Sequence, residues 1–418
     1  MPHPPFLSPI GERNGVRGES TLPALVRLRL PALLVPLLLL SAPVWSAEPW
    51  TLERALQQAH AQNPDARLAR QRLAAAQAGL EQANAAFWPK AQIQSSYTRT
   101  DNPMFSFGNI LNQRAFSPSI DFNDVPDTDN LNVRGAVTVP LYAGGRHTAN
   151  RQAAQAGAAA ARQDSAAVHN ALAFEVTRAF LTVLKARQFV AATEATVRSF
   201  ATNRDVAARQ MDAGRLLKSD VLDLDVRLAQ AREDAVRARN GLALSEQALR
   251  NLLGLAAGGF AVADQAPEAS VPESQDVSQR PELAAAEQRE AAALAAAKAA
   301  RSGYQPQVSA FGSYDYDRGW ELDGEGRHYA GGLVAQWDLW DGLSTRAKSR
   351  EAQANLEMAR ETQAKLRLAL DLELSQARLD LQAATERLAV SEAAVDQAAE
   401  SAQLTRNRFA QGLALTSR

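Results

Sequence analysis

The chain has 418 residues, of which 46% are hydrophobic and 22% are charged, and this composition is ordinary for a folded protein. The formal net charge of -1 gives no indication of a nucleic-acid partner. The lack of cysteine suits an oxidising compartment. Long stretches rich in Ala, Gln, Arg and Leu, separated by a few Pro and Gly residues, indicate long helices with sharp ends.

The amino terminus has the order of segments that is typical of a secretory signal peptide. Arginines precede an apolar run at 33–40, and small residues follow it. A membrane-spanning helix is the rival interpretation, but the run is short and prolines interrupt it. We therefore expect residues 1–47 to be a cleaved signal peptide. Because this region has no cysteine, we expect no bacterial lipid anchor.

The rest of the chain contains two copies of one unit. Pro64 and Pro89 recur with equal spacing as Pro281 and Pro306. Glycines recur in the same way, in the pairs Gly144 with Gly342 and Gly214 with Gly412. This internal repeat predicts a duplicated helix–strand–strand–helix unit. We expect the first repeat at 48–253, a linker at 254–280 and the second repeat at 281–418.

Hydrophobicity alternates with a period of two in four segments of about ten residues, which matches outer-membrane strands. The four expected strands lie at about 90–100, 130–142, 306–316 and 327–340. A soluble β-sandwich also alternates, so each strand is a weak signal alone. The connection Asp101 to Asn130 is rich in Asn, Asp and Pro, and we expect an exposed loop there.

Long helices are expected at about 145–212, 219–253 and 344–410. In the first of them, apolar residues from Leu172 to Phe200 are spaced alternately by four and three, which is the period of a coiled coil. The same spacing recurs from Leu370 to Ala398. A two-helix hairpin in a soluble core is the simpler alternative, but a helix of this length makes a rod of about 100 Å.

Four strands cannot close a membrane barrel, because the smallest such barrels have about eight strands. Unpaired sheet edges in lipid cost several kcal/mol for each bare backbone group. Copies of the chain must therefore complete the sheet by symmetric assembly. This argument does not by itself select the number of copies.

Taken together, these features make the chain resemble the TolC-like outer membrane efflux family over about residues 50–418. The residues that carry the resemblance are Pro89-Lys90, Pro306-Gln307, the run Pro140 to Gly145, and Ala213-Gly214-Arg215. The resemblance implies a mainly α fold with a small β part. It implies a trimer with a 12-stranded β-barrel in the outer membrane and a periplasmic α-barrel built from coiled-coil helices.

The resemblance also implies a function and partners. The expected function is a passive export conduit of a tripartite efflux or type I secretion system in a Gram-negative bacterium. Its partners would be a periplasmic adaptor and an inner-membrane transporter of the RND, ABC or MFS type. The alternative is a periplasmic coiled-coil adaptor or scaffold without a pore. We expect no enzyme activity, cofactor or metal, because the sequence contains no nucleophile–base arrangement, phosphate loop or metal-ligand spacing among its histidines.

The candidate site residues fall into four groups. The resemblance implies adaptor-docking tips at Gly214, Arg215, Leu216, Ser219, Gly412, Leu413 and Ser417. Asp220 and Asp223 are expected to cap the helix that follows the tip. The resemblance gives an alternative, because some family members tether the closed tip from an acidic residue at the first of these positions to a Tyr and an Arg. This chain has Phe409 and Ala414 where those two partners would be. Gly144, Gly145 and Gly342 mark the change from strand to helix. Phe87, Trp88, Tyr142, Trp337 and Trp340 are a possible aromatic belt at the membrane surface, with packing beneath the barrel as the alternative.

One expectation concerns the carboxyl end. The first repeat continues into a returning helix after Gly214, whereas the sequence stops at Arg418, shortly after Gly412. We expect the sequence to be a truncation or a frameshifted product that lacks this last helix. A longer reading frame without a segment resembling 219–253 would contradict this expectation.

Overall fold

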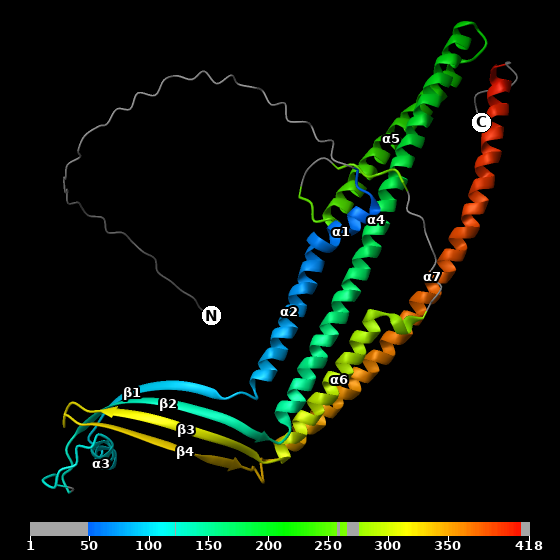
Figure 1. The fold of residues 1–418 in the computed structure, drawn as a ribbon. Coiled ribbons are helices and arrows are strands. Elements are labelled where there is room, and N and C mark those ends of the chain that lie inside the picture. Colours follow the sequence, from blue (N-terminus) through cyan, green and yellow to red (C-terminus); the bar gives the residue numbers. More distant parts are fainter. Residues whose placement is uncertain (1–48, 122, 257–259, 266–275, 411–418) are drawn as a thin grey trace, which may run out of the picture. The chain divides into compact units, whose positions relative to one another are not determined.

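The computed structural model describes residues 49–121, 123–256, 260–265 and 276–410. The expected signal peptide and the expected tip residues Gly412, Leu413 and Ser417 lie outside these ranges. Within them, long helices accompany one sheet (Figure 1). The helices are α1 (Leu52–Gln62), α2 (Pro64–Ala85), α3 (Pro103–Asn112), α4 (Arg146–Asp212), α5 (Lys218–Leu252), α6 (Pro281–Arg301) and α7 (Ser344–Ala410), with 3-10 turns η1 (Val277–Gln279) and η2 (Ser302–Tyr304). The strands are β1 (Lys90–Thr100), β2 (Thr128–Ala143), β3 (Gln307–Arg318) and β4 (Glu325–Gln336).

The described residues form an antiparallel sheet with the strand order β1-β2-β3-β4. The two repeats meet in its centre, where β2 pairs with β3. The register shifts between Pro140 and Tyr142, because proline has no N–H to give to the ladder. The mainly helical chain with a small antiparallel sheet confirms the expected fold class.

Local sequence signals fix the helix boundaries at the amino-terminal end. The Thr51 side chain accepts the Arg54 N–H and caps α1. Asn63 ends α1 in an extended conformation, as expected for a residue before proline, and its Oδ1 accepts the Asp65 N–H at 2.7 Å to start α2. In the described residues, no helix combines the length and the apolar content that a membrane crossing needs.

Two expectations about the sheet region are wrong. The last strand ends at Gln336 and not at about 340. Gln336 pairs with Gln307, the first residue of β3, and Pro306 just before β3 has no N–H with which to continue the ladder. The connection between β1 and β2 is not a simple exposed loop. It contains α3 and buries Ile110 and Gln113, because α3 packs back on the sheet.

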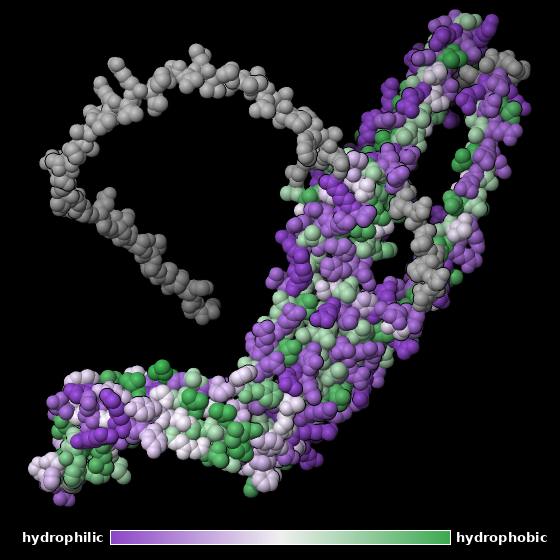
Figure 2. Space-filling model, in the orientation of Figure 1, coloured by the Kyte–Doolittle hydropathy of each residue, from purple (hydrophilic) through white to green (hydrophobic). Residues whose placement is uncertain are grey.

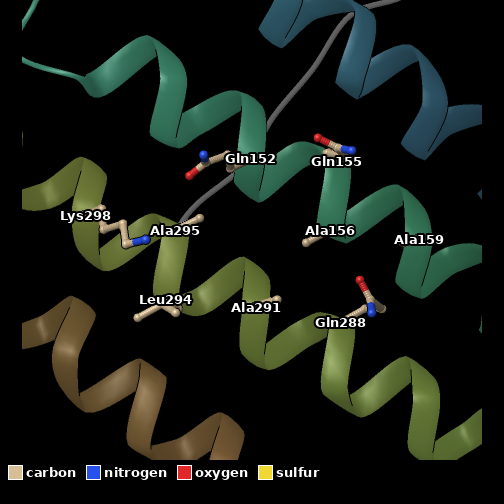
Figure 3. Close-up of a pocket in the computed structure, with 9 residues that line it drawn as sticks. All are labelled: Gln152, Gln155, Ala156, Ala159, Gln288, Ala291, Leu294, Ala295 and Lys298. Carbon is tan, nitrogen blue, oxygen red and sulfur yellow. The ribbon is translucent and has the colours of Figure 1, made fainter.

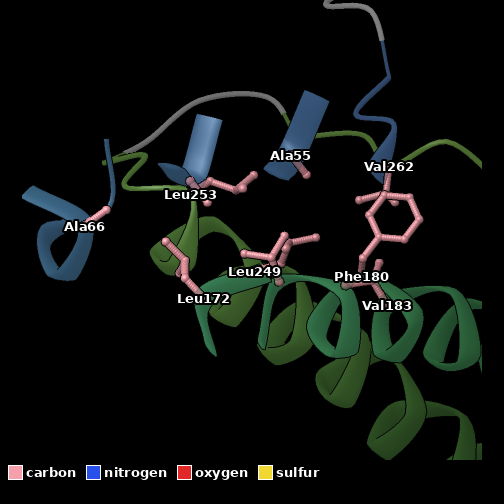
Figure 4. Packing of buried hydrophobic residues seen from close by; sticks show 10 residues of the cluster. Ala55, Ala66, Leu172, Phe180, Val183, Leu249, Leu253 and Val262 are labelled. Atoms are coloured by element: carbon pink, nitrogen blue, oxygen red, sulfur yellow. The ribbon is translucent and has the colours of Figure 1, made fainter. Parts of the chain in front are cut away.

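The main apolar core lies where α1, α4 and α5 meet (Figure 4). Phe180 is fully buried there, together with Leu249 and Leu253. Val262, from the expected linker, is 3% exposed in the same cluster. The backbone of Trp50 bonds to Ala261 and Ala263, so this part of the expected linker is held in the core rather than being a plain connector.

The predicted coiled-coil seam has different surroundings in the two repeats. In α4, Leu172, Val176 and Val183 are buried against neighbouring helices. In α7, Leu370 is buried, but Leu381 and Leu388 are 50% and 60% exposed. The reason is that α4 packs on α2, α5 and α6, whereas the main helical neighbour of α7 in the described chain is α6.

Candidate functional site

The sheet has one apolar face and one polar face, since paired residues of antiparallel strands project to the same side. Figure 2 shows hydrophobic colouring gathered on the sheet, whereas the helical part is mostly hydrophilic. The apolar face carries Ile93, Tyr97, Val133, Val137, Tyr314, Tyr316, Tyr329 and Leu333, which share rows of the register. Several of these side chains are strongly exposed, and Ile93 reaches 85%. Such a surface is costly in water and is suited to lipid.

The polar face carries a network that sequence reasoning missed. Asp315 and Asp317 are each 1% exposed on β3. The Arg134 Nε lies 2.6 Å from the Asp315 Oδ1, and the Asn130 Nδ2 donates to the Asp317 Oδ1 at 2.6 Å. The His328 Nδ1 is 3.5 Å from the Asp317 Oδ2. The alternation of polar residues in these strands was the available signal, but the cross-strand pairing that joins them needs the register.

Both edges of the sheet are unpaired within the described chain, because β1 and β4 are its outer strands. β1 is exposed along its length up to Arg99, and most of β4 is exposed as well. Exposed edges present free N–H and C=O groups to any further strand. The sheet can therefore be extended on both sides.

The turn between α4 and α5 is a compact tip. Gly214 has φ +73°, and the Arg215 N–H reaches back to the Gln210 carbonyl at 2.8 Å, which closes the end of α4. Leu216 packs with a small cluster around Val221 and Leu224. Arg215 and Ser219 are exposed. The tip thus presents a glycine backbone and polar side chains on an apolar support.

The two acidic residues after the tip have different surroundings. The Asp220 Oδ2 accepts the Leu217 N–H at 3.1 Å, so this carboxylate caps the first turn of α5. Asp223 is exposed. The capping function of Asp220 is sufficient to account for its position.

Two glycines connect β2 to α4. Gly144 has φ +61°, and a Cβ at this position would lie 2.6 Å from the Gln305 Cβ and 2.8 Å from the Ser302 carbonyl oxygen. Gly145 has φ +81° but has open space around it. Gly342, in the second repeat, has φ +66° with open space. Gly144 is therefore required both by its conformation and by the close approach of the chain before β3.

The five candidate belt residues gather at the end of the sheet next to the helices, because each precedes β1, ends β2 or follows β4. Trp88 and Trp340 are 70% and 77% exposed. The Trp337 Nε1 donates to the Tyr304 carbonyl at 3.2 Å. Phe87 is less exposed and packs edge-on against His147. Tyr142, at 47% exposed, completes the group.

A shallow groove of about 350 Å³ runs between α4 and α6 (Figure 3). Alanines such as Ala156 and Ala295 let the helices approach, and glutamines with Lys298 surround the groove. Its lining contains no carboxylate and no histidine. We find no paired acid and base here, so the groove has no arrangement for general acid–base chemistry.

Two histidines meet in the structure although they are far apart in sequence. His60 on α1 and His169 on α4 place their Nδ1 atoms 2.6 Å apart, with ring centroids at 4.8 Å. At this separation one Nδ1 donates its proton and the other accepts it. Burial lowers the pKa of His169, and the charges of His60 and Arg70 lower it further. Within the described ranges, no three His, Cys, Asp or Glu residues are grouped to hold a metal ion.

Comparison with known proteins adds independent findings. The family model described as "Outer membrane efflux protein" matches residues 55–255 and 274–416. VceC from Vibrio cholerae, an outer membrane protein, is similar with a TM-score of 0.72 and 19% identity, over 87% of this chain and 86% of VceC. The CmeC outer membrane channel of Campylobacter jejuni is similar with a TM-score of 0.74 and 15% identity, over 87% and 77% of the two chains. The search of curated proteins gives no match.

The junction glycines give a matched pair of variants. We expect Gly144→Ala to lower the melting temperature of the helical circular dichroism signal more than Gly145→Ala does. Both variants place alanine in the left-handed region at a cost of about 1 kcal/mol. In addition, the methyl group of Gly144→Ala would come too close to Ser302 and Gln305, so the junction between β2 and α4 has to move away from them. Equal melting temperatures for the two variants would contradict this explanation.

The histidine pair predicts a pH dependence. Because the folded-state pKa of His169 is lowered, the unfolded chain binds its proton more readily once the pH falls through about 6.5. Stability from this site is therefore complete at higher pH and decreases as the solution is acidified. We expect His169→Gln to reduce the loss of melting temperature between neutral and mildly acidic pH. Identical pH profiles for the two proteins would show that the pair has no such effect.

Proposed function

Because the chain belongs to the outer membrane efflux protein family, we propose that three copies form a channel through the outer membrane that continues into the periplasm. In this proposal β1 to β4 of each copy contribute to a closed barrel of twelve strands. The long helices form the periplasmic part. The channel is a passive conduit of a tripartite efflux or type I secretion system.

The observation that supports the channel most directly is the combination of two faces and two free edges in the sheet. The apolar face suits lipid and the polar face suits a water-filled interior. Strands in lipid need partners for all their backbone groups, and the edges at β1 and β4 leave those groups unpaired in one chain. Pairing between copies removes both edges at once. A soluble scaffold would have no use for an exposed apolar face of this kind.

We propose that the five aromatic residues from Phe87 to Trp340 lie at the membrane surface nearest the periplasm. Tyr and Trp favour such positions because one part of the ring is apolar and another part forms hydrogen bonds. Their position at the helical end of the sheet supports this assignment. Residues 1–47 would direct export and be removed.

The partners in this proposal are a periplasmic adaptor and an inner-membrane transporter of the RND, ABC or MFS type. The adaptor would contact the tip between α4 and α5, where Gly214 exposes its backbone and Arg215 and Ser219 are accessible. The equivalent contact in the second repeat would use Gly412, Leu413 and Ser417. In this scheme Asp220 and Asp223 stabilise the tip rather than bind the adaptor.

Two neighbouring residues on β1 test the membrane assignment. We expect Ile93→Arg to prevent stable insertion, since a cation on the lipid face costs about 2–4 kcal/mol near the midplane. The matched variant Gln94→Arg places the same charge on the polar face and should leave insertion intact. The measurement is the yield of heat-resistant oligomer in outer-membrane fractions. A soluble periplasmic monomer in the wild type, or equal losses in both variants, would contradict the channel.

The tip assignment has a separate test. We expect Ser219→Arg to reduce co-purification of the crosslinked adaptor and transporter, because a bulky cation obstructs a close backbone contact. The yield of oligomer should not change. Gln247→Arg, an exposed position near the other end of α5, is the control and should leave co-purification unchanged. If neither variant reduces co-purification of the partners, the docking surface lies elsewhere.

A further inference from the structure

The connection between β1 and β2 holds an apolar helix in a fixed position against the sheet. The α3 side chains Met104 and Phe105 are 77% and 68% exposed. Phe116, in the segment after α3, is 52% exposed. Met104 and Phe116 border an open apolar hollow of about 560 Å³, whose lining also includes Pro103, Phe107 and Val125. An exposed patch of this kind usually marks an interaction surface.

Buried hydrogen bonds hold α3 in place. Gln113, just after the helix, is 1% exposed and donates from Nε2 to the Asp129 carbonyl at 2.6 Å and to the Asn130 Oδ1 at 3.0 Å. Asn109 donates to the Thr128 hydroxyl at 3.0 Å. A buried amide with two partners is costly to displace, because its polar atoms would lose their partners. The helix is therefore anchored and is not a free loop.

Glycines in the hairpin of β3 and β4 leave the space that Gln113 and the end of α3 occupy. A Cβ at Gly326 would overlap the Asn112 carbonyl oxygen, and a Cβ at Gly319 would overlap the Gln113 side chain. Gly326 pairs with Asp317, whose side chain lies on the polar face. The end of α3 therefore packs on the polar face of the sheet, on the side away from Ile93 and Tyr97.

We propose that α3 of each copy meets α3 of the other copies across the outer mouth of the channel and closes it with apolar contacts. This inference depends on the proposed function, in which the polar face lines the interior. A helix anchored on that face projects toward the symmetry axis and cannot contact lipid. Because the copies are identical, a charged residue on α3 would face the same charge on the neighbouring copies. The sequence from Asn102 to Gln113 contains no charged residue, which suits such a contact.

The closure would act by excluding water. Hydrophobic constrictions block ions by dewetting rather than by filling the pore completely. Met104 and Phe105 are flexible or large enough to meet across a gap, and both are already exposed in one chain. Outward passage of cargo would then require these contacts to separate, while the anchor at Gln113 stays in place.

The chain has no cysteine, so single-cysteine variants give a clean test. We expect Met104→Cys oligomers, treated with a short thiol crosslinker that reduction can cleave, to form linked copies. In planar lipid bilayers the crosslink should hold the α3 contacts together, so the openings of the untreated oligomer should become severalfold rarer and return on reduction. Ile93→Cys, which faces away from the interior, should show neither effect. A further variant, Phe105→Asp, brings like charges together at the axis and should raise the open conductance severalfold.

The outcomes separate the two proposals. If wild-type oligomers conduct but Met104→Cys neither crosslinks nor responds to reduction, the closure by α3 is wrong and the channel stands. If the wild type forms no oligomer and conducts nothing, the proposed function fails, and the closure fails with it. Crosslinking at Met104 together with the thiol-dependent conductance supports the closure.

Discussion

Unpaired backbone groups at the two outer strands are the constraint on which the other features depend. A sheet with one apolar face can enter lipid, but its edges cannot remain open there. The four strands of one chain pair only with one another in the described residues, so both outer strands are available. In the proposed channel, symmetric copies satisfy these groups and the barrel has no edge. In that barrel the apolar face contacts lipid and the polar network around Asp315 faces the interior. The glycine junction at Gly144 lies where the barrel meets the helices.

The polar face also explains why buried carboxylates are tolerated in a sheet of this kind. Asp315 is paired with Arg134, and Asp317 accepts from Asn130 and Asn132. A buried charge without such partners would be strongly destabilising. The network joins β2 of the first repeat to β3 of the second, so it also strengthens the seam between the repeats. Gln113, which anchors α3, bonds to the neighbouring residues Asp129 and Asn130 on β2. The segment between β1 and β2 is therefore attached to the same seam.

The sequence predicted the features that have a local or periodic signal. The pleat predicted which residues share a face, because alternation is a property of near neighbours along one strand. The end of β4 was missed because Pro306, which precedes β3, limits the pairing of a different segment of the chain, and the last pair is Gln307 with Gln336. The fixed position of α3 was missed because Gln113 is held by residues of another strand. The contact of His60 with His169 was missed for the same reason, since the two lie on separate helices and have no common spacing. Among the candidate tip residues, the position of Gly214 just after a long helix is typical of a glycine that ends a helix. A docking function, by contrast, follows only from the resemblance.

The two long helices show how duplication and assembly are connected. α4 and α7 have 67 residues each and carry the same seam spacing. In α4 the seam is covered by other helices of the chain, whereas Leu381, Leu388 and Val395 of α7 are at least half exposed. Full burial of an exposed Leu or Val side chain contributes about 1.5–3 kcal/mol, so covering the exposed part of each of these contributes about half to two thirds of that. A second set of helices beside α7 would therefore gain several such contributions, at spacings that a coiled-coil neighbour can fill. The helical part thus has the same requirement as the sheet: an apolar or hydrogen-bonding surface that needs a neighbouring element to complete it.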